Sequence, residues 1–302
     1  MNDSGTYDTT KTERSRLIKV GFVFCLMMAS LLTQSWVSAP HEMDAVTTLA
    51  CYKRKPRGDF SYRVVHKEPV MRNLRMVGKV GRCGIEGSDK TERLYGAILR
   101  AMRFQNITRK VENKYGLPKN LILAMVIQET GGADLLPNCL DDGGIGLCHM
   151  QGSTASSFGV STYRGFNKLV SKTHGRILRA KIKENNYDRK KLIKYDDRFH
   201  PILNLDAAGR MLHCYQQQRV KGLTSMQSGI YRYAGSYNYR HYYRNVQYYR
   251  KKLNDPAVIA AVRKTFNRRN SRLLINGKKG NYDAYINAHQ EQNENYGLKN
   301  YR

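Results

Sequence analysis

Glu129 is the residue of this chain best placed for acid–base chemistry. It ends an almost entirely apolar segment, residues 119–129 (KNLILAMVIQE), which has the pattern of a buried helix. The C-terminal end of a helix carries partial negative charge and therefore disfavours a carboxylate. Met125 and Val126, one turn earlier, would also shield this carboxylate from water. Both effects raise the pKa of a carboxylic acid and favour the protonated form that a general acid needs. The alternative is an ordinary glutamate at a helix end that extends into solvent.

The elements that must position Glu129 are predicted to be helices. Apolar residues recur at helical spacing from Thr91 onward and predict an amphipathic helix before the Glu129 helix, built on Leu94, Ile98, Met102, Ile107 and Val111. The sequence Tyr115-Gly116-Leu117-Pro118 separates the two helices, and Pro118 suits a first helical turn. Gly131-Gly132 is expected to end the Glu129 helix.

The remainder of the chain also favours helices, so the predicted fold class is mainly α. A glycine-rich loop at residues 141–144 precedes a basic, weakly helical segment at 163–195 with Leu169, Ile177, Leu178 and Ile182 as its apolar anchors. Further helices are expected at 204–218, in the tyrosine-dense region 231–249 that Gly235 interrupts, and after Pro256. The polar, Asn-rich segment from Asn276 is expected to be disordered.

Four short motifs follow one another along this helical region. In chain order they are Tyr115–Pro118 with residues 124–132 (AMVIQETGG), residues 143–155 (GGIGLCHMQGSTA), residues 197–201 (DRFHP) with 204–212 (NLDAAGRML), and residues 232–236 (RYAGS) followed by Tyr242 and Val246. Together they resemble the soluble lytic transglycosylase (SLT) domain. The resemblance covers about half of the chain, from Thr91 to Leu253.

This resemblance implies a lysozyme-like helical catalytic domain at residues 89–254 that cleaves the MurNAc–GlcNAc bond of peptidoglycan. Glu129 would be the catalytic acid, and the substrate-binding residues would be Thr130, Gly146, His149, Gln151, Tyr233 and Tyr242. We expect the hydroxyl of Tyr233 to bind Glu129 or the sugar, whereas core packing is the alternative role of Tyr233 and still more of Tyr242. His149 stands where the family usually has glutamine, Ala234 where it has asparagine, and Thr130 where it has serine.

A single acid is unusual, because most glycosidases use two carboxylates. The resemblance implies that Glu129 first protonates the leaving oxygen and then, as a carboxylate, accepts the proton of the sugar's own 6-hydroxyl, which leaves a 1,6-anhydro end. The main alternative is a lysozyme-type hydrolase in which Asp134, Asp141 or Asp142 supplies the second carboxylate. A glycan-binding scaffold without activity is another alternative, which the departures at His149 and Ala234 motivate.

The N-terminus predicts an inner-membrane location with the rest of the chain in the periplasm. Basic residues precede an uncharged segment, residues 20–37, and acidic Glu42 and Asp44 follow it, which places the N-terminus in the cytoplasm. We therefore expect a cytoplasmic segment at 1–16, a membrane anchor or signal at 17–38, a basic connector at 39–88 and a basic, partly disordered tail at 255–302. A retained anchor is favoured over a cleaved signal because Pro40 follows the small-residue site at Val37–Ala39.

The formal net charge of +28 over 302 residues implies an anionic partner. Nucleic acid, acidic lipid and an anionic wall polymer all fit this charge, but export across the membrane argues against nucleic acid. Peptidoglycan glycan strands are the expected partner, and the resemblance also suggests a secretion or conjugation apparatus. No cofactor is expected.

Export would allow disulfide bonds. The cysteines beyond the apolar segment are five in number, so at least one thiol is expected to stay free or to pair between molecules, and the candidates are Cys51, Cys83, Cys139, Cys148 and Cys214. Cys139–Cys148 and Cys148–Cys214 are both compatible with the sequence. No metal site is expected, because the chain has neither a CxxC pair nor paired histidines at ligand spacing.

Overall fold

The computed structural model describes residues 79–81, 84–86, 90–133, 135, 137, 142–163, 172–275 and 277–301. The chain divides into two compact units, Met1–Ala45 and Val46–Arg302, and all described residues belong to the second. The described part is mainly helical, as predicted. The predicted cytoplasmic segment at 1–16 and membrane segment at 17–38 lie outside the described residues. Within the described part, no helix has the length and apolar character needed to cross a membrane.

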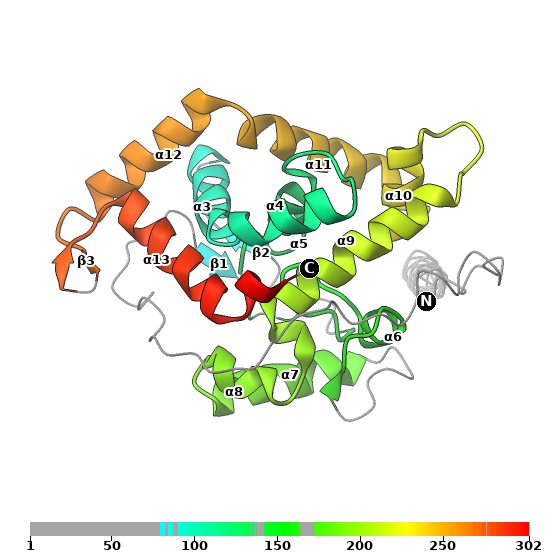
Figure 1. The fold of residues 1–302 in the computed structure, drawn as a ribbon, viewed down its shortest axis with the longest axis horizontal. Helices are drawn as coiled ribbons and strands as arrows, with labels where there is room; N and C mark the ends of the chain where they lie inside the picture. Colours follow the sequence, from blue (N-terminus) through cyan, green and yellow to red (C-terminus); the bar gives the residue numbers. More distant parts are fainter. Residues whose placement is uncertain are drawn as a thin grey trace, which may run out of the picture. The chain divides into compact units, whose positions relative to one another are not determined.

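Helix α5 (Leu121–Thr130) lies at the centre of the fold and ends beside the candidate acid. Seven consecutive residues, Leu121–Ile127, are buried, so every face of the helix must be covered by protein. The cover comes from α3 (Lys90–Met102), α4 (Gln105–Lys114), α9 (Pro201–Gln217) and α11 (Tyr239–Leu253) (Figure 1). The predicted buried helix is therefore confirmed, and Gly131 ends it with φ +56°.

The amphipathic helix predicted from Thr91 is two helices, α3 and α4, which are separated at Arg103 and Phe104. Its apolar residues have the predicted spacing, but the break changes the direction of the chain. Phe104 is thereby buried, and the Arg103 guanidinium donates a hydrogen bond of 2.6 Å to the carbonyl of Gly132, just beyond α5. Such a tertiary contact has no signature in helical spacing.

The start of α5 depends on a buried carboxylate. The helix begins at Leu121, so Pro118 lies before it and the expectation that it occupies the first turn is wrong. The side chain of Glu112, on α4, accepts hydrogen bonds from the backbone N–H groups of Asn120 and Ile122 at 2.8 and 2.9 Å. Burial raises the pKa of Glu112 to about 7, although these two N–H groups act to lower it.

Replacing Glu112 with alanine is expected to destabilise the protein. The change leaves the first N–H groups of α5 without acceptors in a buried place, which costs about 1–3 kcal/mol. Urea unfolding of the full-length protein measures this change in the free energy of unfolding. Glu112→Gln, which keeps one acceptor oxygen, should lose less stability than Glu112→Ala. Equal stability of the alanine variant and the wild type would contradict the assigned role.

The predicted downstream helices are present. They are α7 (Lys172–Glu184) and α8 (Arg189–Ile193) in the basic segment, α9, α10 (Ser225–Ala234) and α11. The structure adds two short helices that the sequence did not predict, α6 (Gly152–Ser157) and η3 (Asp197–Phe199). Leu178 and Ile182 anchor α7 as predicted, whereas Ile177 is 39% exposed and is not an anchor because it faces away from the packed side of the helix. Leu169 lies outside the described residues. In the predicted connector, β1 (Lys79–Gly81) pairs antiparallel with β2 (Gly84–Glu86).

The prediction of a disordered tail is wrong. The helix predicted after Pro256 is present as α12 (Pro256–Arg269), but the region beyond it also folds, into the short strands β3 (Leu274–Ile275) and β4 (Lys278–Lys279), α13 (Tyr282–Asn295) and η4 (Leu298–Asn300). In Figure 1, α12 (orange) leads away from α11, and α13 (red) returns the chain toward α4 and α9. The tail is ordered because its few apolar residues are buried, among them Phe266, Tyr285, Tyr296 and Leu298. In addition, the Tyr301 hydroxyl donates a hydrogen bond of 2.6 Å to Asp206 on α9.

Candidate active site

Glu129 and Tyr242 form the centre of the candidate site. The Tyr242 hydroxyl, on α11, donates a hydrogen bond of 2.6 Å to Oε1 of Glu129, at the end of α5. The Glu129 side chain is 19% exposed, so its carboxyl group is largely enclosed but still open to an incoming molecule. The structure thus combines the two requirements of a buried general acid, a restrained carboxyl group and access to substrate.

The environment of Glu129 favours its protonated form near neutral pH. Burial raises its pKa to about 7, the Tyr242 hydrogen bond lowers it in part, and the negative charge of Asp142 raises it further. Between about pH 4.5 and 7 the folded protein keeps the proton of Glu129, whereas the unfolded chain has lost it. The contribution of Glu129 to the free energy of unfolding therefore falls as pH rises through this window. A general acid with this pKa is protonated at and below neutral pH.

The loop that carries His149 folds into a tight turn opposite Glu129. Ile145 and Met150 exchange backbone hydrogen bonds of 3.2 and 3.1 Å, which close the turn. His149 has a φ of +42°, an uncommon conformation for a residue with a side chain and one that is often found at functional sites. Its Nδ1 lies 3.7 Å from Oε2 of Glu129, close enough for an ion pair when the imidazole is protonated.

Residues of the third motif form hydrogen bonds to the backbone of this turn. Arg198 is completely buried and pairs with the buried Asp196 at 2.8 Å, while its Nη1 donates hydrogen bonds of 2.6 and 2.9 Å to the carbonyls of Gly143 and Met150. Asn204 accepts a hydrogen bond from the Cys148 N–H at 3.0 Å. The side chains of Arg198 and Asn204, both in the third motif, therefore hold the backbone of the second motif in place.

Hydroxyl groups of the first and fourth motifs contact backbone carbonyls of the same turn. The Thr130 hydroxyl, which donates to the Val126 carbonyl of its own helix at 2.9 Å, lies 3.2 Å from the Leu147 carbonyl, and the Tyr233 hydroxyl donates to the Cys148 carbonyl at 2.8 Å. Tyr233 therefore does not bind Glu129, and Tyr242, predicted to bind substrate with core packing as its alternative role, makes that contact. Thr130 is 7% exposed, and its hydroxyl is occupied by the backbone. Thr130 and Tyr233 both shape the site, and Thr130 is buried whereas Tyr233 is half-buried.

The structure gives the other predicted substrate-binding residues different surroundings. A side chain at Gly146 would collide with Asn204 and with the carbonyl of Arg198, at 2.3 and 2.4 Å from its Cβ, and φ is +81°. Close packing within the protein therefore requires this glycine, whichever ligand approaches. The Gln151 side chain donates to Asp142 at 3.1 Å, so His149, and not Gln151, lies next to Glu129.

Two of the candidate cysteines are described. Cys148 is a buried free thiol, so both predicted pairings of Cys148 are wrong. Burial raises its pKa, and the negative charge of Glu129 raises it further. Cys214 is disulfide-bonded, and its partner is not among the described residues because Cys148 is free. Cys51, Cys83 and Cys139 lie outside the described residues, as do the loop carboxylates Asp134 and Asp141.

Sequence reasoning missed the roles of Asp142, Arg198 and Tyr242. Helical spacing contains a signal for Tyr242, because Tyr239, Tyr242, Val246 and Leu253 are the buried residues of α11 and follow one helical face. That spacing shows that Tyr242 faces the core, but it does not show that Glu129 is its neighbour. For Arg198 the sequence offers no comparable signal, since a buried arginine is an exception among charged residues.

If Glu129 acts as the predicted general acid, replacing Tyr242 with phenylalanine should shift the pH–rate profile of the reaction to higher pH. The hydroxyl favours the carboxylate form of Glu129, so its loss raises the pKa of Glu129. The alkaline limb, which begins near pH 7 where Glu129 loses its proton, should therefore move upward. Tyr243→Phe on the same helix is the control and should leave the limb in place. A limb that stays fixed or moves downward in Tyr242→Phe would rule out this hydrogen bond as a determinant of the pKa.

No group of three or more His, Cys, Asp or Glu side chains that could hold a metal ion is found in the described part of the chain. A scan against models of protein families gives no match for the sequence. Searches of curated proteins and of solved structures give no match either.

Proposed function

We propose that the chain is a peptidoglycan lytic transglycosylase with a lysozyme-like helical domain and Glu129 as its acid and base. The observation that carries the proposal is the convergence of the four motifs. Glu129 and Thr130 of the first, the turn of the second, Arg198 and Asn204 of the third, and Tyr233 of the fourth are joined by direct hydrogen bonds or contacts. Tyr242, beyond the fourth motif, completes the set.

The proposed reaction needs only one ionisable group. Glu129 gives its proton to the glycosidic oxygen as the bond from that oxygen to the anomeric carbon breaks. The 6-hydroxyl of the same sugar then attacks the anomeric carbon and passes its proton to the Glu129 carboxylate. The acid is regenerated, a 1,6-anhydro end is formed, and water is not consumed. A pKa of about 7 suits both half-reactions, because the group must lose and regain the proton readily.

The other residues of the site would support Glu129. The Tyr242 hydroxyl stabilises the carboxylate once the proton has left, because a hydrogen bond to a charged oxygen is stronger than one to a neutral oxygen. A protonated His149 would add a positive charge 3.7 Å from the other oxygen. The family's usual glutamine could not supply this charge, so the departure at His149 is compatible with activity.

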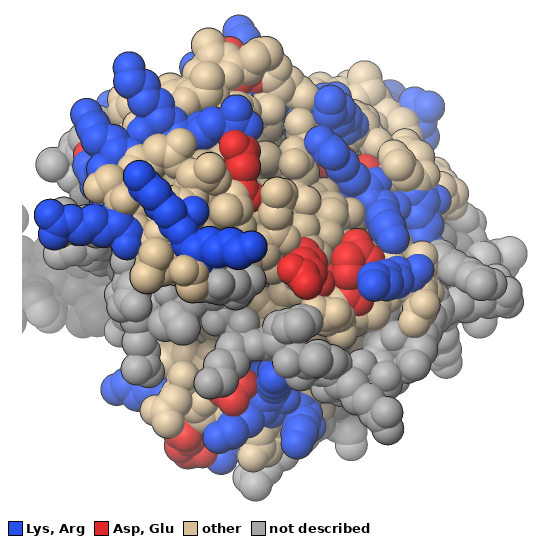
Figure 2. All heavy atoms as spheres, turned by 60° about the vertical axis from the view of Figure 1, so that its left-hand side comes forward, with Lys and Arg blue, Asp and Glu red and all other residues tan. Residues whose placement is uncertain are grey.

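The basic surface suits an anionic wall polymer. The formal net charge is +28, and Figure 2 shows Lys and Arg side chains spread over the visible face with few Asp or Glu among them. Binding of this kind is screened by salt. We therefore expect co-sedimentation of the protein with insoluble peptidoglycan to weaken as ionic strength rises.

A lysozyme-type hydrolase is the second candidate, and Asp142 is the observation that favours it. Its carboxylate is close enough to raise the pKa of Glu129, as a second catalytic carboxylate would be. However, Asp142 accepts hydrogen bonds from the Gly144 N–H at 2.9 Å and the Gln151 amide at 3.1 Å, which also explains it as a loop-forming residue.

The proposal is tested by incubating the full-length protein with purified insoluble peptidoglycan and measuring soluble fragments. Release of fragments identifies an enzyme, whereas binding without release identifies a scaffold and contradicts the proposal. The Asp142→Asn variant distinguishes a transglycosylase from a hydrolase. A hydrolase that needs this carboxylate should lose about 10²-fold or more in rate. The transglycosylase should retain activity, with its alkaline limb moved to lower pH because the charge that raised the pKa of Glu129 is gone.

A further inference from the structure

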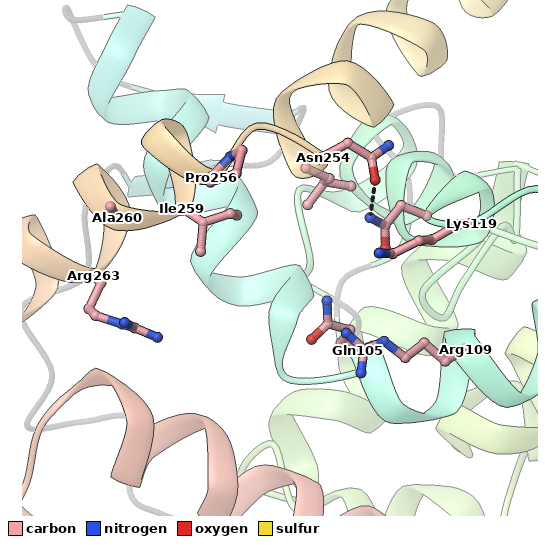
Figure 3. Close-up of a pocket in the computed structure, with 10 residues that line it drawn as sticks. Gln105, Arg109, Lys119, Asn254, Pro256, Ile259, Ala260 and Arg263 are labelled. Carbon is pink, nitrogen blue, oxygen red and sulfur yellow. Dashed lines mark hydrogen bonds between the residues drawn. The ribbon is translucent and has the colours of Figure 1, made fainter.

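A cavity lies at the opposite end of α5 from Glu129. Its volume is about 290 Å³, and residues of α4, the start of α5 and the α11–α12 junction form its walls (Figure 3). Asn120 and Glu129 are nine residues apart, so about 13 Å of helix at 1.5 Å per residue separates the cavity from the candidate acid. This volume is just below the range of roughly 300–1,000 Å³ of ordinary ligand pockets, so it suits a small group rather than a polymer strand.

Three cationic side chains line the cavity. Arg109 comes from α4, Lys119 precedes α5 and Arg263 comes from α12, and in Figure 3 the guanidinium groups of Arg109 and Arg263 extend toward the space between these two helices. Arg263 also pairs with the exposed Asp283 at 2.9 Å. Arg109 and Lys119 are exposed, so their charges are available to an incoming anion.

Asn120 lines the same cavity and carries a buried acceptor. It is 2% exposed, and its amide nitrogen donates a 3.0 Å hydrogen bond to Oδ1 of Asn254, the dashed line in Figure 3. The amide of Asn254 in turn donates to the carbonyl of Arg250, and this bond fixes the orientation of both amide groups. The carbonyl oxygen of Asn120 is left without a hydrogen-bond partner. A buried acceptor in a lined cavity indicates a ligand with an N–H or O–H donor.

The remaining wall is apolar and comes from residues such as Pro256, Ile259 and Ala260. We propose that the cavity binds the C-terminal residue of a short peptide. Its carboxylate would be held by Arg109 and Lys119, and its own amide N–H would donate to Oδ1 of Asn120. A small aliphatic side chain would pack against the apolar wall. A free carboxylate, an adjacent amide N–H and a small apolar group are the three features that this lining complements, and a C-terminal residue carries all of them. The inference does not depend on the chemistry of Glu129.

The test is calorimetric titration of the full-length protein with N-acetyl-alanyl-alanine, which has a free carboxylate. Binding is expected, and the same peptide with its carboxylate converted to an amide should bind about tenfold more weakly or worse, since the charge-assisted hydrogen bonds are lost. Equal affinity for the acid and the amide would overturn the proposal. Inorganic phosphate is titrated in parallel, and phosphate binding as tight as peptide binding would overturn the peptide assignment in favour of a general anion site.

Substitutions of cavity residues test whether the peptide binds in this cavity. Arg109→Gln combined with Lys119→Gln should weaken binding of the acid peptide by about tenfold or more. The matched control combines Lys264→Gln with Arg268→Gln, two exposed cations of α12 outside the cavity, and should bind the peptide as the wild type does. Equal weakening in both double variants would show a non-specific effect of net charge and contradict the site.

Discussion

Replacing Glu129 with glutamine is expected to slow peptidoglycan cleavage by about 10²–10⁴-fold, the range that a positioned general acid contributes. Glutamine has nearly the same shape and can still accept the hydrogen bond from Tyr242, so the packing at the end of α5 should be kept. It cannot give a proton to the glycosidic oxygen or take one from the 6-hydroxyl. The loss should therefore appear in the rate of fragment release and not in binding to peptidoglycan.

Glu184→Gln is the control for this change. Glu184 is 56% exposed and pairs with Lys181 at the surface of α7, so the variant removes the same charge away from the site. Its rate should match that of the wild type. If Glu129→Gln released fragments as fast as Glu184→Gln, Glu129 would not be the catalytic acid.

The second large effect concerns stability. Replacing Arg198 with methionine is expected to lower the free energy of unfolding by about 3–5 kcal/mol, because it leaves Asp196 as an unpaired charge where both side chains are completely buried. The carbonyls of Gly143 and Met150 would also lose their donor. Since these carbonyls flank the turn that carries His149, any folded Arg198→Met protein should also cleave peptidoglycan more slowly. Urea unfolding measures the first effect and fragment release the second.

An exposed ion pair provides the comparison. Arg263→Met breaks a pair with Asp283 in which the two side chains are 51% and 55% exposed. Exposed pairs contribute about 0–1 kcal/mol, so this variant should be nearly as stable as the wild type. Similar losses in Arg198→Met and Arg263→Met would mean that the buried pair does not hold the turn as described.

Most helices could be predicted from the sequence because the burial of one helix face makes apolar residues recur at helical spacing. The apolar residues 121–127 have no polar face, so the element that they form must be covered on all sides, and the Gly131-Gly132 pair beyond them favours a helix. Gly131 and Gly235 mark helix ends in both sequence and structure. The break between α3 and α4 and the folded tail could not be predicted in this way. Both depend on tertiary contacts of single residues, such as Phe104 in the core and Tyr301 on Asp206.

The candidate site was predictable in its members but not in its contacts. Motif order identified Glu129, His149, Tyr233 and Tyr242 as a group, and the structure brings all four to one place. The partner of each hydroxyl depends on how α10 and α11 lie against α5, which no local pattern contains. For this reason the contact with Glu129 was assigned to Tyr233, whereas Tyr242 makes it.

The most direct test of the proposed reaction is cleavage of peptidoglycan by the full-length protein in water enriched in oxygen-18, with the fragments analysed by mass spectrometry. The intramolecular reaction predicts fragments that end in 1,6-anhydro-MurNAc and carry no label, because the 6-hydroxyl and not water attacks the anomeric carbon. Fragments with reducing ends that carry the heavy oxygen would contradict the account. They would show that water is the nucleophile and that the site is a hydrolase.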